Sequence, residues 1–171
     1  MTMSDKVRIG IIGVGTIGSV HANNYAKVAN AEVVALCDIL PDRLAEKAKT
    51  HNVAKTYADY NELLADPEIE IIVNLTYPES HFEISSRAMK AGKHVISEKP
   101  VTLSMESLER MIAASKKAGK KLMIGQCVRF ASPSKYIKKL VDEGTYGKVK
   151  SALFQRKSAP PYWGWDNWYL D

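Results

Sequence analysis

The sequence predicts an α/β fold, a doubly wound parallel sheet with helices on both faces. Three observations support this. Short apolar runs alternate with helical patterns over about 125 residues, and the first run leads directly into a glycine-rich turn. The connections are also long enough for helical crossovers between parallel strands. The expected strands are Val7–Ile12, Glu32–Cys37, Ile69–Leu75, His94–Ser97, Lys121–Gly125 and Val149–Gln155.

Capping residues predict where the intervening helices begin and end. Proline is tolerated in a first helical turn, Ser and Asp favour N-caps, and glycine favours the position just after a helix. The spacing of Asp59 with Glu62, and of Ser80 with Glu83, is that of a capping box. We therefore expect helix starts at Pro41, Asp59, Ser80, Ser104 and Ser132, and helix ends at Gly92, Gly119 and Gly144.

Composition and charge exclude several classes of protein. The net charge of +5 comes from lysines at expected helix ends and exposed faces, with few aromatic residues among them, so we expect a solvated surface and no nucleic-acid partner. No apolar run approaches the ~20 residues that span a bilayer, so no membrane association is expected. Cys37 and Cys127 form no paired motif. Together with the lack of a visible secretory signal, this predicts reduced, mostly buried thiols and a cytoplasmic location.

The strongest local motif is Gly13-Val14-Gly15-Thr16-Ile17-Gly18, which follows a strand and opens a helix. In such a loop the first glycine permits the tight turn and the second lets a pyrophosphate approach the backbone. The third lets the helix pack closely on the strand. The free amides at the helix start then face the phosphates. The motif predicts a dinucleotide-binding Rossmann fold whose phosphate-binding residues are Gly13, Gly15, Thr16, Ile17 and Gly18.

An acidic residue completes this fingerprint. Asp38 ends the second expected strand, 20 residues after Gly18. A carboxylate at this position can accept hydrogen bonds from the adenosine ribose hydroxyls and repels the 2′-phosphate of NADP, so NAD is the expected cofactor. Arg43 lies close enough along the chain to shield a 2′-phosphate, which leaves NADP as the alternative.

A second motif carries a resemblance to a known family. The segment 74–100 reads NLTYPESHFEISSRAMKAGKHVISEKP. It resembles the Gfo/Idh/MocA oxidoreductases (glucose–fructose oxidoreductase, inositol 2-dehydrogenase and relatives), in which a Thr-Pro-Asn-like turn precedes a helix-opening His. An Ala-Gly-Lys-His-Val run then leads into Glu-Lys-Pro. Tyr77 departs from the family, which usually has proline there. Residues 125–130 are similar to the family's link into its second domain.

The resemblance implies an NAD(P)-dependent oxidoreductase that moves a hydride between the nicotinamide and a sugar, inositol or similar polyol. Lys99 would be the catalytic residue, contacting substrate and aiding proton transfer, since a cation near a hydroxyl favours its deprotonated form. No metal is expected, because the histidines lack ligand spacing with other His, Cys or carboxylate groups. The further cofactor-binding residues would be Leu75, Thr76, Pro78, His81, Glu98, Lys99 and Gln126.

The family resemblance also implies a second domain. Family members are roughly twice as long, with an α+β second domain that supplies an Asp and an acid–base His. Here no His follows His94. We therefore expect a Rossmann domain over residues 1–125 and a truncated start of the α+β domain over 126–171, whose aromatic residues would cover an absent sheet. Little activity is expected from this chain alone, and homo-oligomers would form through the second domain. The alternative is a non-catalytic nucleotide-binding or regulatory module.

Overall fold

The computed structural model describes residues 6–155 and 157. The chain divides into two compact units, Met1–Gly125 and Gln126–Asp171, here the N-terminal and C-terminal units. The aromatic tail expected to cover a missing sheet, from Tyr162 to Tyr169, lies outside the described residues.

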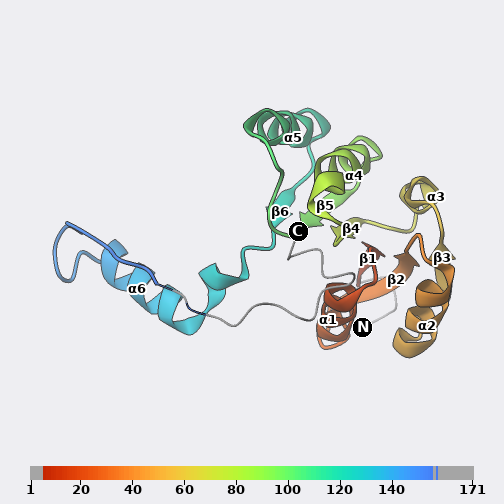
Figure 1. Ribbon diagram of the computed structural model, residues 1–171, viewed down its shortest axis with the longest axis horizontal. Helices are drawn as coiled ribbons and strands as arrows, with labels where there is room; N and C mark the ends of the chain where they lie inside the picture. Colours follow the sequence, from red (N-terminus) through yellow and green to blue (C-terminus); the bar gives the residue numbers. More distant parts are fainter. Residues whose placement is uncertain (1–5, 156, 158–171) are drawn as a thin grey trace. The chain divides into compact units, whose positions relative to one another are not determined.

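The N-terminal unit is built on a six-stranded parallel sheet with the order β3-β2-β1-β4-β5-β6 (Figure 1). This order arises when the chain winds outward from β1 to one edge, then returns to the centre and winds to the other edge. The predicted doubly wound Rossmann sheet is thereby confirmed. The strands are β1 (Val7–Ile12), β2 (Ala31–Cys37), β3 (Lys55–Tyr57), β4 (Ile71–Asn74), β5 (His94–Ser97) and β6 (Leu122–Ile124).

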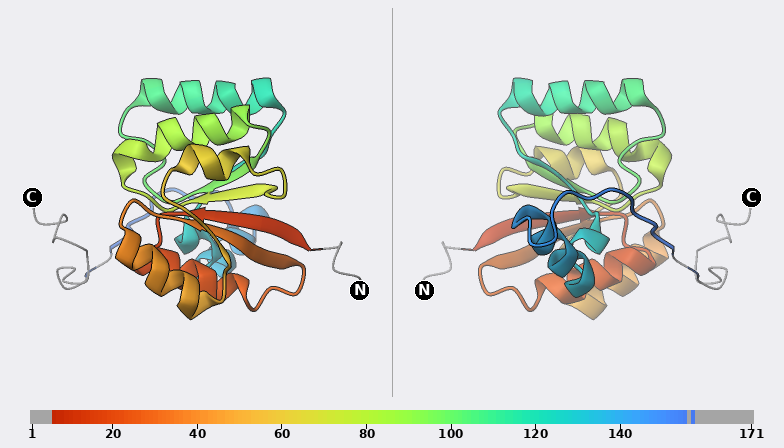
Figure 2. Two further views of the ribbon diagram at one scale, coloured as in Figure 1. Left: turned by 90° about the vertical axis from the view of Figure 1, so that its right-hand side faces the viewer. Right: turned by 90° about the vertical axis from the view of Figure 1, so that its left-hand side faces the viewer.

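Helices cover both faces of the sheet (Figure 2). On one face Ala22 and Leu44 pack with strand residues such as Ile11, and on the other Leu63 and Met89 pack with strand residues such as Ile12 and Ile72. Each fully buried Ile or Leu contributes about 1.5–3 kcal/mol. One layer consists of α1 (Thr16–Tyr25) and α2 (Pro41–His51), and the other of α3 (Tyr60–Ala65), α4 (Pro78–Lys90) and α5 (Met105–Ala118).

Most predicted helix caps are present, and one is wrong. The Asp59 side chain accepts from the Asn61 amide, the Ser104 side chain accepts from the Ser107 amide, and Gly119 has the left-handed backbone of a helix end. Ser80, by contrast, lies inside α4, which begins at Pro78 with Tyr77 as its N-cap. The fixed φ of proline already suits a first helical position, so the helix starts two residues before the expected cap.

The C-terminal unit contains a 3-10 helix, η2 (Cys127–Phe130), and α6 (Ser132–Asp142). The predicted strand at Val149–Gln155 is wrong: this segment has no strand pairing, and Leu153 and Phe154 are largely exposed. A strand needs a neighbour to satisfy its backbone groups, and no strand lies in the described part of this unit. The expectation of a buried Cys127 is also wrong, because its side chain is exposed.

Cys37 is buried at the end of β2, as expected. Burial, reinforced by the neighbouring Asp38 carboxylate, raises the pKa of the Cys37 thiol to about 12. Within residues 6–155 and 157, no helix has the length and apolar character required to cross a bilayer.

Candidate functional site

The central strands end side by side. The register pairs Ile12 with Asn74 and Asn74 with Ser97, so β1, β4 and β5 finish at one edge. The backbone continues the pairing one residue further: the Leu75 amide donates to the Ile12 carbonyl and the Glu98 amide to the Asn74 carbonyl. The strand order reverses between β1 and β4, and open α/β sheets bind ligands at that point. The fold therefore gathers the two sequence motifs, far apart in the chain, at this edge.

The three glycines of the loop have three different environments. Gly13 has φ of +90°, and a Cβ there would lie 2.8 Å from the Leu75 carbonyl oxygen. A Cβ on Gly18 would lie 2.5 Å from the Gly13 carbonyl oxygen, which is an overlap. A Cβ on Gly15, by contrast, would meet no atom within 4 Å. Gly13 and Gly18 are thus required by the fold itself, whereas Gly15 leaves open space above the backbone, as a bound pyrophosphate needs.

The start of α1 offers hydrogen-bond donors to that space. Gly15 is the N-cap and supplies no side-chain cap. The first-turn amides, which include those of Thr16 and Ile17, have no acceptor within the helix, and the helix dipole places positive potential there. The open space at Gly15 and the uncapped helix start together fit the phosphates of a dinucleotide.

Asp38 lies directly beyond β2 and is almost completely buried, with 4% exposure. Its Oδ2 accepts hydrogen bonds from the Val14 amide at 2.9 Å and from Arg43 Nε at 3.1 Å. Its Oδ1 accepts from the Leu40 amide at 3.0 Å and from Arg43 Nη2 at 2.7 Å. Asp38 therefore lies against the glycine loop, and its carboxylate is already bound by Arg43.

Hydrogen bonds from the loop after β4 to the Asn74 side chain stabilise that loop. The buried Asn74 side chain accepts from the Thr76 amide at 3.3 Å and from the Thr76 hydroxyl at 2.7 Å, and it donates to the Ser85 hydroxyl at 3.1 Å. Leu75, Thr76 and Pro78 remain partly exposed. These three residues are thus available to a ligand at the sheet edge, whereas His81 is buried with 1% exposure.

The strand end after β5 carries Glu98 and Lys99. The Lys99 amide donates to Glu98 Oε2 at 2.9 Å, and the Lys99 side chain is exposed. The Lys99–Pro100 peptide bond is cis. Glu98 Oε1 lies 3.3 Å from Nε2 of His21. This contact, more than any other, lowers the pKa of the Glu98 carboxyl below its usual range. Glu98 is thus an anion held between two elements, next to an exposed lysine.

Sequence reasoning missed His21 and Asn74. The sequence patterns give His21 no role in the site, but its contact with Glu98 joins α1 to the end of β5. The signal was its position three residues after Gly18, which puts both on one helix face. Asn74 could have been noticed as a polar residue ending an apolar strand. Gln126, the last predicted cofactor residue, is exposed and begins the C-terminal unit. The described residues contain no cluster of three metal-ligating side chains.

Comparisons with known proteins agree with this arrangement. Residues 7–126 match the Gfo/Idh/MocA family, described as an oxidoreductase family with an NAD-binding Rossmann fold. The chain is 37% identical over 156 residues to myo-inositol 2-dehydrogenase of Thermotoga maritima, covering 91% of this chain and 47% of that protein. It is 38% identical over 152 residues to an inositol 2-dehydrogenase/D-chiro-inositol 3-dehydrogenase of Lactiplantibacillus plantarum, covering 86% of this chain and 43% of that protein.

A solved structure shares the same fold. Scyllo-inositol dehydrogenase from Lactobacillus casei, with bound NAD(H) and scyllo-inositol, superposes with a TM-score of 0.79 at 30% identity, over 83% of this chain and 42% of that one. The present chain spans about half the length of the curated relatives that it matches. The match over most of the chain, on the fold described above, shows that it belongs to the Gfo/Idh/MocA family of oxidoreductases, with their NAD-binding Rossmann fold.

Proposed function

We propose that this chain is the cofactor-binding part of an NAD-dependent oxidoreductase that moves a hydride between the nicotinamide and a carbon of inositol or a similar polyol. One observation carries the proposal. The open glycine loop, the Thr76 loop and the exposed Lys99 meet at the carboxyl edge of β1, β4 and β5. The substrate class is supported by the inositol dehydrogenases to which the chain is similar.

The residues at this edge would bind different parts of the cofactor. The backbone at Gly15 and the start of α1 would hold the pyrophosphate, and Asp38 would select the adenosine ribose. Leu75, Thr76 and Pro78 would line the path toward the nicotinamide, which supplies the hydride chemistry when bound.

Lys99 would act on the substrate. Its ammonium, exposed at the end of β5, would stabilise a substrate alkoxide and so favour loss of the hydroxyl proton. The Glu98 carboxylate, bonded to the Lys99 amide, would keep that segment in place.

Four further properties are proposed from the sequence. NADP is the alternative cofactor because Arg43 lies against Asp38. Gln126 would contribute to the cofactor site, and homo-oligomers would form through the C-terminal unit. A cytoplasmic location is supported by the sequence's unpaired cysteines, Cys37 and Cys127.

A second candidate function is a non-catalytic nucleotide-binding or regulatory module. The four histidines of this sequence are His21, His51, His81 and His94. Within the N-terminal unit, the rings of His21 and His81 are both engaged with protein groups. The intact Glu98-Lys99-Pro100 segment favours catalysis instead.

An activity assay separates the two candidates. The purified chain is incubated at high concentration with NAD and myo-inositol, scyllo-inositol or glucose, and NADH formation is followed by absorbance. We expect slow NADH formation with a cyclic polyol, abolished in Lys99→Met, while the NADH affinity stays within about twofold. NADH binding without NADH formation from any polyol would favour the regulatory module. Failure to bind NADH would contradict both candidates.

A further inference from the structure

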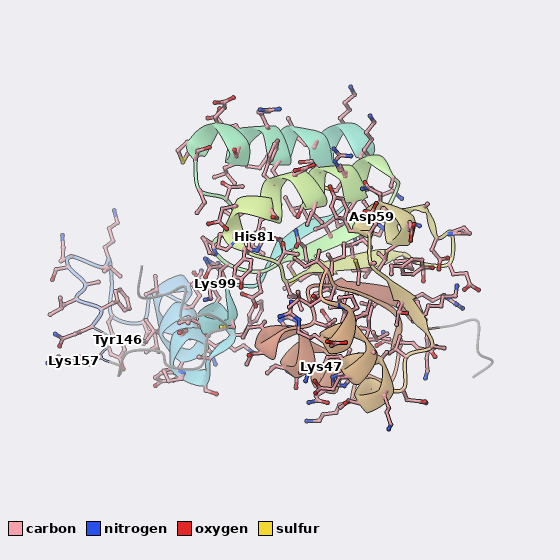
Figure 3. The ribbon with its side chains drawn as sticks, turned by 45° about the vertical axis from the view of Figure 1, so that its right-hand side comes forward. Lys47, Asp59, His81, Lys99, Tyr146 and Lys157 are labelled. Atoms are coloured by element: carbon pink, nitrogen blue, oxygen red, sulfur yellow. The ribbon has the colours of Figure 1, made fainter. Side chains whose placement is uncertain are left out.

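The ring of His81 is buried between two loops of the candidate site. His81 lies in the first turn of α4 and is 1% exposed. Its Nδ1 is 2.7 Å from the carbonyl oxygen of Pro100, and its Nε2 is 3.0 Å from the carbonyl oxygen of Thr76. One imidazole therefore joins the loop after β4 to the loop after β5. Figure 3 shows His81 and Lys99 on the same side of the N-terminal unit.

Both neighbours of the His81 ring are hydrogen-bond acceptors. A carbonyl oxygen only accepts hydrogen bonds, and a neutral imidazole has one N–H and one lone pair. Whichever ring nitrogen carries the proton donates it to the carbonyl that it faces, and the other nitrogen lies within 3.0 Å of the second carbonyl. The ring, which is 1% exposed, therefore contacts both loops.

The charged side chains near His81 are exposed or contact residues other than His81. Glu79 on the same helix turn is exposed, Glu98 contacts His21, and Lys99 is exposed. On α5, the Arg110 guanidinium lies over the ring of Phe82. The contacts to the His81 ring thus come from two carbonyl dipoles.

These contacts fix the backbone around Lys99. Pro100, whose carbonyl bonds His81, follows Lys99 directly, and the Lys99 amide is bonded to Glu98. Backbone contacts therefore restrain the chain at Lys99 itself and at the residue that follows it. The Thr76 carbonyl, on the other side of the ring, belongs to a residue already held by Asn74. His81 links the Thr76 loop to the segment that presents Lys99.

We propose that His81 is a positioning residue for Lys99, that its ring lies between the Thr76 and Pro100 carbonyls, and that it does not contact the cofactor. This inference rests on the proposed function, because it takes Lys99 as the group that acts on substrate. It replaces the expectation that His81 binds cofactor: both ring nitrogens are engaged by protein carbonyls, which leaves neither for a ligand.

Nitrogen NMR of the ring tests these contacts directly. Long-range ¹H–¹⁵N spectra of the purified chain detect the ring N–H protons of the histidines, and His81→Gln assigns the signals. We expect a His81 ring N–H proton that exchanges slowly with water, because it is bonded to a carbonyl in a buried position. A His81 ring proton that exchanges as fast as that of a free imidazole would overturn this part of the proposal.

A variant pair tests the positioning role. His81→Gln is compared with His94→Gln, which removes a histidine at the opposite end of β5, where Nδ1 accepts from the Lys121 amide. Lysines are reductively ¹³C-methylated, and Lys99 is assigned with Lys99→Arg. His81→Gln is expected to shift and broaden the Lys99 signal. Because the Thr76 loop, which lines the cofactor path, loses its contact with the ring, NADH binding should also weaken about threefold to tenfold. His94→Gln is expected to do neither.

An unchanged Lys99 signal in a folded His81→Gln chain would overturn the positioning role, as would equal effects of the two variants. If His81→Gln fails to fold, the nitrogen spectrum of the unsubstituted chain still decides whether a carbonyl holds the ring proton. If the unsubstituted chain binds no NADH, the proposed function fails, while the ring proton and the Lys99 signal still report on His81.

Discussion

The Arg43 guanidinium donates to both oxygens of the Asp38 carboxylate, from Nη2 to Oδ1 at 2.7 Å and from Nε to Oδ2 at 3.1 Å. The amides of Val14 and Leu40 donate one further bond to each oxygen. A carboxylate offers about four lone-pair directions, so the four donors leave no acceptor free for ribose hydroxyls. A ribose diol bound to Asp38 must therefore displace Arg43.

Arg43→Leu should accordingly favour NADH. Removing the guanidinium frees the acceptors of Asp38, and NADH affinity should rise roughly threefold to tenfold, equivalent to about 0.7–1.4 kcal/mol. NADPH affinity should fall, since a cation near its 2′-phosphate is lost. Calorimetric titration measures both. Lys47→Leu, one helical turn further along α2 in a pair with Glu46, is the control and should leave the ratio unchanged. An unaltered NADH/NADPH ratio in Arg43→Leu would show that Arg43 has no part in selectivity.

The contact of His21 with Glu98 predicts a titration effect. Because the hydrogen bond from His21 stabilises the carboxylate, the pKa of Glu98 should lie below that of an ordinary glutamate. His21→Leu should raise it, which carboxyl ¹³C NMR can follow. His51→Leu, a substitution at the end of α2, is the matched control. A Glu98 midpoint that does not move in His21→Leu would refute the assigned cause.

The buried carboxylate of Asp66, at the end of α3, predicts the acid sensitivity of the fold. Asp66 accepts from Lys55 Nζ and from the Tyr57 hydroxyl, both at 2.9 Å, and from the Glu68 amide at 2.8 Å. These bonds, chiefly the one from Lys55, lower the pKa of Asp66 to about 2. The unfolded chain, with the ordinary value, therefore binds more protons between about pH 2 and 4. The stabilisation is complete above this window and is lost as the pH falls through it.

Asp66→Asn should thus lower the free energy of unfolding at neutral pH by on the order of 1 kcal/mol, with the deficit shrinking as the pH falls toward 3. Urea unfolding followed by circular dichroism between about pH 3 and 7 measures this. Glu106→Gln, an exposed carboxylate paired with Arg110 within α5, should change little. A deficit that stays constant with pH would contradict the linkage.

Gly18→Ala should destabilise the chain even without cofactor. The added Cβ would overlap the Gly13 carbonyl, so the start of α1 must move away from the loop. We expect a loss of about 1–3 kcal/mol, as for other overpacked sites. Thermal unfolding is the measurement, and Gly92→Ala provides a comparison in which the strain comes from a positive φ alone. A melting temperature equal to that of the unsubstituted chain would contradict the close approach.

The sequence predicted those parts of the fold that depend on local pattern. Apolar runs located the strands β1, β2, β4, β5 and β6, and the glycine spacing located the loop. Strand β3 was missed because Lys55–Tyr57 is short and, unlike β6, contains no apolar run. It exists because it pairs with the exposed edge of β2 at Ala35–Cys37. The false strand at Val149–Gln155 had the right apolar content but no strand to pair with in the described residues.

In the candidate site too, some residues could be predicted from the sequence and some contacts could not. Residues attached to strand ends, such as Asp38 and Glu98, were predictable because topology alone brings those ends together. Contacts that depend on side-chain direction were not. Nothing in the spacing shows that Arg43 binds both oxygens of Asp38, or that both nitrogens of His81 face carbonyls. Such contacts depend on rotamers that the packed structure selects.

The central claim, that this chain holds NAD on its glycine loop, is tested most directly by calorimetric titration of NADH into the chain and into Gly15→Ala. The added methyl meets no protein atom within 4 Å, so the melting temperature should stay unchanged, but it fills the space that the pyrophosphate requires. We predict clear NADH binding to the unsubstituted chain and a loss of at least about tenfold in Gly15→Ala. Equal NADH affinity in the two chains, or no binding to either, would contradict the account.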